Sequence, residues 1–313
     1  MIRLILAAAL VLGSVNAGAA QTTLRIGDQK GNSRAVMEAA GVLTDVPYKI
    51  EWKEFAAAAP LLEALGAGAI DTGLVGDAPF TFAAAANVPV KAIAAVRQSQ
   101  DGLAILVPEA SAIKSFDDLR GKKIATGRGS IGHQLILAAL ESRGWKASDV
   151  QIVFLAPSDA KVAYTQGSID AWSTWEPYVS QEEVLFKSRR IITAEGLTPG
   201  IGFQVATPDA IKDKRAELED FVRRLTAART WSQGNVAGYA ETWGKLMNIP
   251  TSVPLNWLTR AKIRIAPIDD SVVADEQKTI DLYFRWGLIK QNLNAAEIVD
   301  RSFSVAIGKG AGL

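Results

Sequence analysis

Two weakly similar segments lie 99 residues apart in the chain, and this internal repeat restricts the fold more than any other feature. The segment FAAAAPLLEALGAGAID aligns without a gap with FLAPSDAKVAYTQGSID. The identical pairs are Phe55 and Phe154, Ala57 and Ala156, Ala64 and Ala163, Gly68 and Gly167, Ile70 and Ile169, and Asp71 and Asp170. Alanine-rich helices align readily by chance, but the glycines and aspartates also coincide, so we favour a duplication over coincidence.

Each half of the repeat predicts the same order of strands and helices. The stretch LRIGDQKGNSRAVMEAAG from Leu24 resembles KIATGRGSIGHQLILAALESRG from Lys123. In both, an apolar run meets a glycine-rich turn, and apolar residues at helical spacing follow. Each half therefore reads as strand, turn, helix, strand, helix, short strand, helix. This alternation predicts an α/β protein whose parallel sheets are covered by helices on both faces.

Two such halves predict two lobes with a ligand cleft between them. Ligands bind such sheets at the carboxyl ends of the strands, where the following helices begin. Facing lobes would therefore aim several helix N-termini into one cleft, and their unsatisfied N–H groups favour anions. We expect residues 21–100 and 205–313 to form lobe 1 and residues 101–204 to form lobe 2. The helical segments from about Pro208 onward are expected to cover lobe 1.

The first twenty residues predict a secretory signal peptide. Arg3 is followed by the short apolar stretch LILAAALVLG and by the small residues NAGAA, a pattern that indicates cleavage near Ala20. A membrane anchor is the alternative, but the apolar stretch is short for a bilayer span. The chain has no cysteine, which excludes a lipid-anchored cysteine and disulfides. We therefore expect a soluble protein of the periplasm.

Charge and composition limit the partners and cofactors. The formal net charge is +1, and it falls to zero when Arg3 leaves with the leader. Nucleic acids and acidic membranes both require a basic face, so neither is an expected partner. With one histidine and no cysteine, the chain also lacks the usual ligand set of a zinc site. We expect no metal and no other cofactor.

Residues 127–132 read GRGSIG, which matches the dinucleotide-binding pattern G-x-G-x-x-G. A nicotinamide site would need an acidic residue about twenty positions further on. Asp149 stands near that spacing but follows a Gly-Trp turn, where a loop is expected. A phosphate-binding P-loop would need Lys and Ser or Thr after the last glycine, where this chain has His133 and Gln134. Both nucleotide interpretations are therefore disfavoured.

The same turn predicts a site for a smaller anion. Gly129, Ser130 and the backbone that follows can present N–H groups, and Arg128 can hold two oxygens at once. The alternative is a helix N-cap by Ser130 with Arg128 in solvent. His133 follows on the first helical turn, where it could donate to the anion or be a packing residue.

The segment AWSTWEP predicts a second part of the site. Trp172 and Trp175 could line the apolar wall of a pocket or could pack in a core. Glu176 occupies the position in the repeat that corresponds to Asp77, and the two carboxylates could face each other across the cleft. A helix N-cap is the simpler role for Asp77.

These segments resemble the periplasmic aliphatic-sulfonate-binding proteins of ABC importers, within the wider nitrate, sulfonate and taurine group. The resemblance runs from about Thr23 to beyond Ile289 and includes AIDTGLVGDAPF and DAWSTWEP. It implies a type II periplasmic-binding-protein fold, with two α/β lobes joined by a two-strand hinge and a ligand cleft between them. Carried over residue by residue, it places at the ligand Gln29, Gly76 and Asp77 from lobe 1, and Arg128, Ser130, His133, Trp172, Trp175 and Glu176 from lobe 2.

The resemblance also implies a function. A sulfonate stays ionised at neutral pH and only accepts hydrogen bonds, so its head group suits the donors of the GRGSIG turn, and its tail suits an apolar wall. We therefore expect a monomeric protein that is not an enzyme and that delivers an organosulfonate anion to an ABC permease. The alternatives are a binder of taurine, sulfate esters or nitrate, an enzyme such as a nicotinamide oxidoreductase or a pyrimidine-synthase relative, and a sensor for a membrane kinase.

Overall fold

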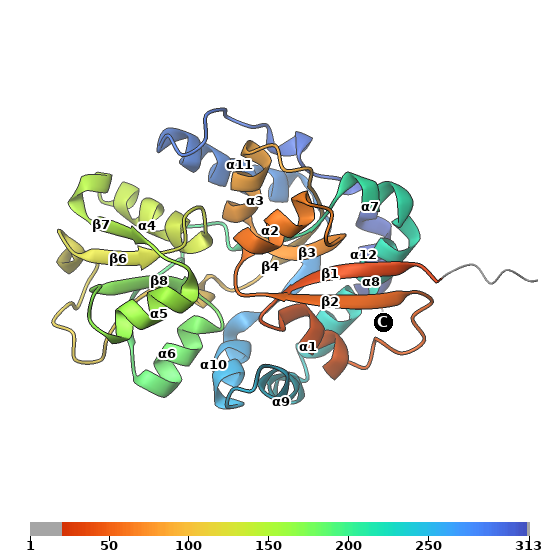
Figure 1. Cartoon of the computed structure of the whole chain (residues 1–313), viewed down its shortest axis with the longest axis horizontal. Coiled ribbons are helices and arrows are strands. Elements are labelled where there is room, and N and C mark those ends of the chain that lie inside the picture. Colours follow the sequence, from red (N-terminus) through yellow and green to blue (C-terminus); the bar gives the residue numbers. More distant parts are fainter. Residues whose placement is uncertain (1–20, 312–313) are drawn as a thin grey trace, which may run out of the picture.

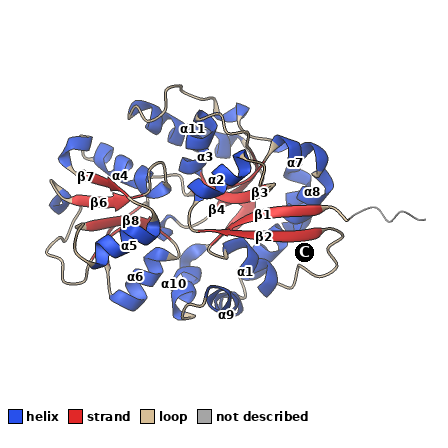
Figure 2. Cartoon of the chain, in the orientation of Figure 1, coloured by secondary structure: helices blue, strands red, loops and turns tan. Residues whose placement is uncertain are grey.

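Two α/β lobes lie side by side in the computed structural model, which describes residues 21–311 (Figure 1). The signal peptide predicted for residues 1–20 lies outside the described residues. Figure 2 shows that each lobe has its own group of strands with helices packed around it. Within residues 21–311, no helix is both long enough and apolar enough to cross a membrane.

Lobe 1 is built on a six-stranded sheet. Its strands are β1 (Thr23–Gln29), β2 (Lys49–Phe55), β3 (Thr72–Gly76), β4 (Lys91–Arg97), β10 (Ile201–Ala206) and β11 (Arg264–Ala266). Their order in the sheet is β11-β4-β10-β3-β1-β2. Strands β1, β2 and β3 run parallel, whereas β10 pairs antiparallel with both β3 and β4.

Helices cover both faces of this sheet. They are α1 (Asn32–Ala39), α2 (Ala58–Gly66), α3 (Asp77–Ala85), α7 (Pro208–Asp213), α8 (Arg215–Ser232), α9 (Val236–Met247), α10 (Ser252–Ala261), α11 (Asp270–Arg285) and α12 (Ser304–Ala311). On one face, Leu24 and Ile26 of β1 belong to a buried cluster with α1, α8 and α9. On the other face, Val75 and Phe203 pack with α2 and α3. Both faces are therefore buried, as an α/β sheet requires.

Lobe 2 has a five-stranded sheet and three longer helices. The elements are β5 (Leu103–Val107), β6 (Lys123–Thr126), α4 (Ile131–Ser142), β7 (Gln151–Phe154), α5 (Pro157–Thr165), β8 (Ala171–Trp175), α6 (Tyr178–Phe186) and β9 (Arg189–Thr193). The strand order is β7-β6-β8-β5-β9. Short 3-10 helices lie at Gln100–Gly102, Asp117–Leu119 and Ala147–Asp149. Two more, at Ala295–Glu297 and Arg301–Phe303, lie between α11 and α12 in the C-terminal part of the chain. Helix α4 covers one face of the sheet, and α5 and α6 cover the other.

The two lobes repeat one topology, as the sequence repeat predicts. The order β2-β1-β3 matches β7-β6-β8, and an antiparallel strand comes next in each sheet. The repeated aspartates also have the same role. The carboxylate of Asp71 accepts from Arg25 N at 2.7 Å while Asp71 N donates to Arg25 O at 2.8 Å, and Asp170 makes the same two bonds with Lys123 at 2.8 and 2.9 Å.

The chain crosses between the lobes twice, at residues 98–102 and 194–200. The amide of Ala194 donates to Leu103 O at 3.0 Å, and that of Gln98 donates to Gly200 O at 3.3 Å. The two crossing segments are therefore joined to each other by backbone hydrogen bonds. Both are short, and a relative rotation of the lobes would have to take place within them.

Strand β10 corrects the expected lobe boundary. All six of its residues, Ile201–Ala206, pair within the sheet of lobe 1. The expected boundary between residues 204 and 205 would cut this strand, so lobe 2 ends before Ile201. The error arose because β10 takes a place between two strands from far earlier in the chain, which local sequence patterns do not reveal.

Two C-terminal helices contact both lobes, whereas the sequence predicted that they cover lobe 1. From α10, Asn256 Nδ2 donates to Ser180 Oγ of lobe 2 at 3.1 Å. From α11, the hydroxyl of Tyr283 donates to Ser130 O at 3.2 Å. Tyr283 also shares a buried apolar cluster with Leu137 of α4. Polar and apolar contacts therefore join the lobes on two sides.

Candidate functional site

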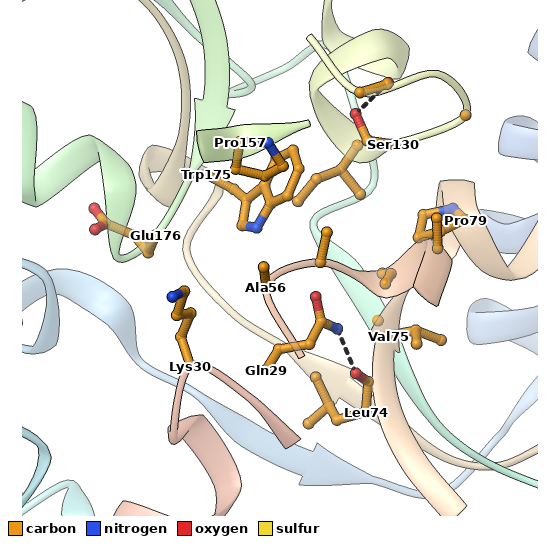
Figure 3. Close-up of a pocket in the computed structure, with 18 of the residues that line it drawn as sticks. Gln29, Lys30, Ala56, Leu74, Val75, Pro79, Ser130, Pro157, Trp175 and Glu176 are labelled. Carbon is orange, nitrogen blue, oxygen red and sulfur yellow. Dashed lines mark hydrogen bonds between the residues drawn. The ribbon is translucent and has the colours of Figure 1, made fainter. Parts of the chain in front are cut away.

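A cavity of about 480 Å³ lies between the lobes, where the parallel strands end and the helices begin. Five helices contribute residues of their first turn or N-cap region to its lining: α1 through Asn32, α2 through Ala57 to Pro60, α3 through Gly76 and Pro79, α4 through Ser130 and Ile131, and α5 through Ala156 and Pro157. This is the arrangement that the repeat predicts. Figure 3 shows part of the lining, contributed by both lobes.

The helix N-termini differ in the N–H groups that they leave for a ligand. In α1, the first-turn amides of Ser33 and Arg34 donate to the buried carboxylate of Asp28 at 3.0 and 3.1 Å. In α4, Ser130 Oγ accepts from His133 N at 3.2 Å, which leaves the earlier amide of Ile131 without an intrahelical acceptor. The N-terminus of α1 therefore already binds a carboxyl group, whereas that of α4 leaves its first amide for a ligand.

Arg128 is the predicted site residue with the clearest access to a ligand. Its side chain is exposed, lines the cavity, and lies over the ring of Phe154 with Cζ 3.9 Å from the ring centroid. Among residues 21–311, no carboxylate forms an ion pair with it. The aromatic ring holds the flat guanidinium from one side, and the N–H groups at its edge stay available for oxygens of a ligand.

The GRGSIG turn both caps helix α4 and lines the cavity, the two roles that its sequence allowed. Ser130 is the N-cap of α4, and its hydroxyl also donates to Gly127 O at 2.7 Å, yet it lines the cavity. Gly129 has a positive φ of 69°, which a residue with Cβ adopts at a cost. A Cβ on Gly129 would also lie 2.9 Å from the ring of Phe82 in lobe 1.

His133 does not line the cavity and has the packing role. It is buried, with its ring 4.9 Å from that of Phe154 between centroids and 6.2 Å from that of Tyr283. Its Nδ1 accepts from Gly129 N at 3.3 Å, which helps to shape the turn. Burial, with a smaller contribution from the charge of Arg128, lowers the pKa of His133 to about 4. The imidazole is therefore neutral near pH 7. It holds the turn and packs on Phe154 without lining the cavity.

Of the other predicted residues, Gln29, Gly76 and Trp175 line the cavity, whereas Trp172 does not. The indole of Trp172 is buried in the core of lobe 2 between Tyr164 and Tyr178. The reason is the alternation of strand β8, which sends Trp172 to one face of the sheet while Trp175 stands at the strand end. Gln29 Nε2 donates to Leu74 O at 2.6 Å, so its amide is already oriented (Figure 3).

The carboxylate of Asp77 does not enter the cavity. It is buried at the contact between α3, α4 and α11, where it accepts from Gln134 Nε2 at 2.8 Å and from Thr279 Oγ1 at 2.7 Å. Burial raises the pKa of Asp77, and these two bonds offset part of that rise. Asp77 therefore joins the lobes behind the site instead of facing Glu176 across it.

Glu176 borders the cavity, but its carboxyl group is turned away from Trp175 and the cavity interior (Figure 3). It accepts from Ser180 N at 3.0 Å and from Ser180 Oγ at 2.9 Å, and Arg260 of α10 lies 3.4 Å away. Burial raises the pKa of Glu176 to about 8 despite the bonds from Ser180. Near pH 7 the carboxyl group is therefore mostly protonated.

Several lining residues were missed by the sequence analysis. Most are small or apolar, and they include one cation and one amide: Lys30, Asn32, Ala56, Ala57, Leu74, Val75, Pro79, Val96, Phe154, Pro157, Ile201 and Trp257. The repeat could have indicated the alanines and Pro157, because they lie at the equivalent starts of α2 and α5. Lys30 directly follows β1, a position that the rule for α/β sheets marks as part of a site. Trp257 comes from α10 and has no such signal.

Comparisons with known proteins agree on one group. A family model described as "NMT1/THI5 like" matches residues 49–233. The chain is 32% identical to an aliphatic sulfonates-binding protein of Escherichia coli (strain K12), over 90% of this chain and 89% of that protein. It is 31% identical to a protein of the same description from Bacillus subtilis (strain 168), over 90% of this chain and 83% of that protein.

Solved structures give the same result. The alkanesulfonate-binding protein SsuA from Xanthomonas axonopodis pv. citri, bound to MOPS, is 31% identical with a TM-score of 0.84, over 91% of this chain and 100% of that chain. The periplasmic aliphatic sulphonate binding protein SsuA from Escherichia coli is 31% identical with a TM-score of 0.79, over 89% and 92%. The desulfurization enzyme DSZB, at 12% identity and a TM-score of 0.66 over 93% and 99%, shares the fold alone.

Proposed function

Because this chain belongs to the NMT1/THI5-like family, and within it to the aliphatic sulfonate-binding proteins, we propose that it is the substrate-binding protein of an ABC importer. It captures aliphatic sulfonates in the periplasm, after cleavage of a signal peptide near Ala20, and delivers them as a monomer to a membrane permease. The ligand contacts both lobes and thereby favours their closed arrangement.

The observation that carries this proposal is Arg128 at the N-terminus of α4. An aliphatic sulfonate is a permanent anion at neutral pH, and its oxygens accept hydrogen bonds without donating any. The guanidinium of Arg128 and the first amides of α4 are donors on one side of the cavity. Within the described cavity lining, the only carboxyl group is that of Glu176, which is turned away and mostly protonated. The head group therefore meets donors without a competing negative charge.

The apolar part of the lining suits the tail of the ligand. Trp175 and Pro157 come from lobe 2, and Leu74 and Pro79 come from lobe 1 (Figure 3). A carbon chain buried against these side chains gains roughly 0.8 kcal/mol for each methylene removed from water. Nitrate and sulfate carry no carbon and gain nothing from such a wall. This difference favours an organosulfonate over an inorganic anion.

The same geometry disfavours the enzyme hypothesis. General acid–base catalysis needs a titratable group within hydrogen-bond reach of the substrate. Among the described residues, His133 is buried behind the turn, and Asp77 and Glu176 direct their carboxyl groups to other partners. None of these three groups is therefore placed to act as a general base on a ligand in the cavity.

Isothermal titration calorimetry with a panel of anions tests the proposal. We expect heat from ethanesulfonate, propane-1-sulfonate and longer alkanesulfonates, with affinity rising by about fourfold per methylene until the cavity is filled. Nitrate and sulfate should bind far more weakly. Absence of binding by every alkanesulfonate, in protein that is folded by circular dichroism, would remove the proposal.

A matched pair of arginine variants tests the head-group contact. Arg128→Ala should weaken binding of every sulfonate, whatever its tail, by roughly 2 kcal/mol, or about thirtyfold in Kd. Arg120→Ala removes an arginine with a similar stacking contact, 4.4 Å from the ring centroid of Trp145, that does not line the cavity. Equal effects of the two substitutions would mean that only net charge matters and that Arg128 does not hold the ligand.

A further inference from the structure

The cavity contains a second cation, Lys30, and we propose that it selects sulfonates whose tail carries another anionic group, such as a carboxylate or a second sulfonate. This inference rests on the proposed function and concerns the substrate class. Lys30 belongs to lobe 1, whereas Arg128 belongs to lobe 2. A ligand with an anion at each end can therefore pair with one cation from each lobe.

Hydrogen bonds fix the backbone of Lys30, and so they fix the position from which its side chain enters the cavity. Its φ is 53°, in the left-handed region, which is unfavourable for a residue with Cβ. Its amide donates to Phe55 O at 3.3 Å, and its carbonyl accepts from the indole of the buried Trp243 at 2.6 Å. Figure 3 shows the side chain extending from this point to the part of the cavity that Ala56 and Glu176 border. Lys30 is thus part of a fixed turn rather than of a loose loop.

The charges around Lys30 leave it available to a ligand. In the described part of the chain, Lys30 forms no ion pair, although it lines a cavity that Glu176 also borders. The carboxyl group of Glu176 instead receives two bonds from Ser180, and the guanidinium of Arg260 lies 3.4 Å from it. Two cations therefore line the cavity, and a monoanionic alkanesulfonate neutralises only one of them.

The size of the cavity leaves room for the second group. Its volume of about 480 Å³ lies within the range of about 300–1,000 Å³ that is usual for drug-sized ligands. Small residues keep it open on the lobe 1 side, where Ala56, Ala57 and Gly76 line the wall. A small inorganic anion would leave much of this space to water. A ligand with polar groups at both ends would occupy more of it.

The same cation should discriminate against an ammonium group at the same position. Like charges brought together in a partly desolvated cleft repel each other, which is a recognised source of specificity. Lys30 therefore predicts an order of affinity in which an anionic tail binds tighter than an uncharged tail, and an uncharged tail binds tighter than a cationic one.

Calorimetry with three ligands of matched length tests this order. The ligands are 3-sulfopropanoate, propane-1-sulfonate and taurine, which place a carboxylate, a methyl or an ammonium group on the same ethanesulfonate core. In the wild-type protein, we expect 3-sulfopropanoate to bind about tenfold tighter than propane-1-sulfonate. Taurine should bind weakest of the three.

Three lysine variants identify the group responsible. Lys30→Met should abolish the preference for 3-sulfopropanoate and bring taurine closer to propane-1-sulfonate, whereas Lys30→Arg should keep the wild-type order. Lys53→Met removes the same charge from β2, where Lys53 lies 3.6 Å from Glu51 and outside the cavity lining, and should also keep the order.

The outcomes separate the two proposals. Equal wild-type affinities for 3-sulfopropanoate and propane-1-sulfonate, or an unchanged ratio in Lys30→Met, would overturn the role of Lys30 while leaving sulfonate binding intact. A loss of preference in both Lys30→Met and Lys53→Met would also overturn it, because net charge alone would then explain the order. Failure of these three ligands and of the longer alkanesulfonates to bind would overturn the proposed function itself.

Discussion

His133 is the only histidine in the chain, and its protonation reports on the GRGSIG turn. The imidazole is buried behind Arg128, and burial lowers its pKa to about 4 from an ordinary value of 6.5. In nitrogen-detected NMR spectra, its single set of imidazole signals should therefore remain that of the neutral ring from pH 8 down to about pH 5. Its Nδ1 should also show the shift of a nitrogen that accepts a hydrogen bond, here from Gly129.

The control for this titration is the same protein in urea, where the signals should titrate near 6.5. A midpoint near 6.5 in the folded protein would show that His133 is exposed to water. Arg128→Ala should raise the folded pKa, since removal of the neighbouring positive charge makes protonation less costly.

At the scale of single residues, the sequence predicted which segments form the cavity better than it predicted where side chains point. Gln29 is the last residue of β1, and Arg128 and Ser130 lie in the turn after β6, so the fold class alone brings them to the cleft. Asp77 and Glu176 occupy equivalent positions, but their carboxyl groups turn to Gln134 and Ser180. Such partners are set by packing between elements, and a local pattern does not contain them.

At the scale of elements, the glycines of the site act at two different contacts. A Cβ on Gly132 would lie 2.6 Å from the backbone oxygen of Ser173 on β8, which lies in the same lobe. A Cβ on Gly76 would lie 2.6 Å from Cγ2 of Ile131 in the opposite lobe. Neither glycine has a positive φ, so the close approach rather than the backbone conformation requires it. The first contact supports the fold of lobe 2, and the second allows the lobes to meet.

Alanine substitutions should separate these two effects. Gly132→Ala should lower the free energy of unfolding by about 1–3 kcal/mol, because backbone must move to admit the methyl group. Gly76→Ala should leave stability nearly unchanged but should weaken sulfonate binding severalfold and increase the radius of gyration of the liganded protein in X-ray scattering. Gly234→Ala, which has open space around its Cβ, is the control. Unchanged affinity in Gly76→Ala would show that Ile131 simply moves aside.

The order of elements was largely predictable, because the repeat fixes it. Helices α2 and α5 start 99 residues apart, as do strands β3 and β8, which is the offset of the sequence alignment. The dual contacts of α10 and α11 could not be predicted in the same way. Their apolar faces indicate burial, but not which lobe they are buried against, since both lobes offer similar helix-covered surfaces.

At the scale of the whole molecule, the buried carboxyl group of Glu176, between Ser180 of α6 and Arg260 of α10, makes stability depend on pH. Glu176 has a folded pKa of about 8, against an ordinary value of 4.5. Between these values the unfolded chain has lost the proton while the folded protein keeps it. Its contribution to stability is therefore complete below pH 4.5 and is lost progressively as the pH rises to about 8.

Glu176→Gln should remove this dependence. The difference in free energy of unfolding between Glu176→Gln and the wild type should shift in favour of the variant as the pH rises from 5 to 8, by a few kcal/mol in total. Urea unfolding at several pH values measures it, and taking the difference cancels the opposite pH dependence of His133 and the parallel one of Asp28. A difference that does not vary with pH would mean that Glu176 is ionised in the folded protein.

The insertion of β10 also determines the order in which the chain can be completed. All strands of lobe 2 lie within residues 103–193, so that lobe can form every one of its strand pairs from one continuous segment. In lobe 1, β10 lies between β3 and β4 in the sheet. Strand β10 follows lobe 2 in the chain, so it is synthesised only after all the strands of lobe 2. During synthesis or refolding from the N-terminus, the lobe that begins first is therefore the one that is finished last.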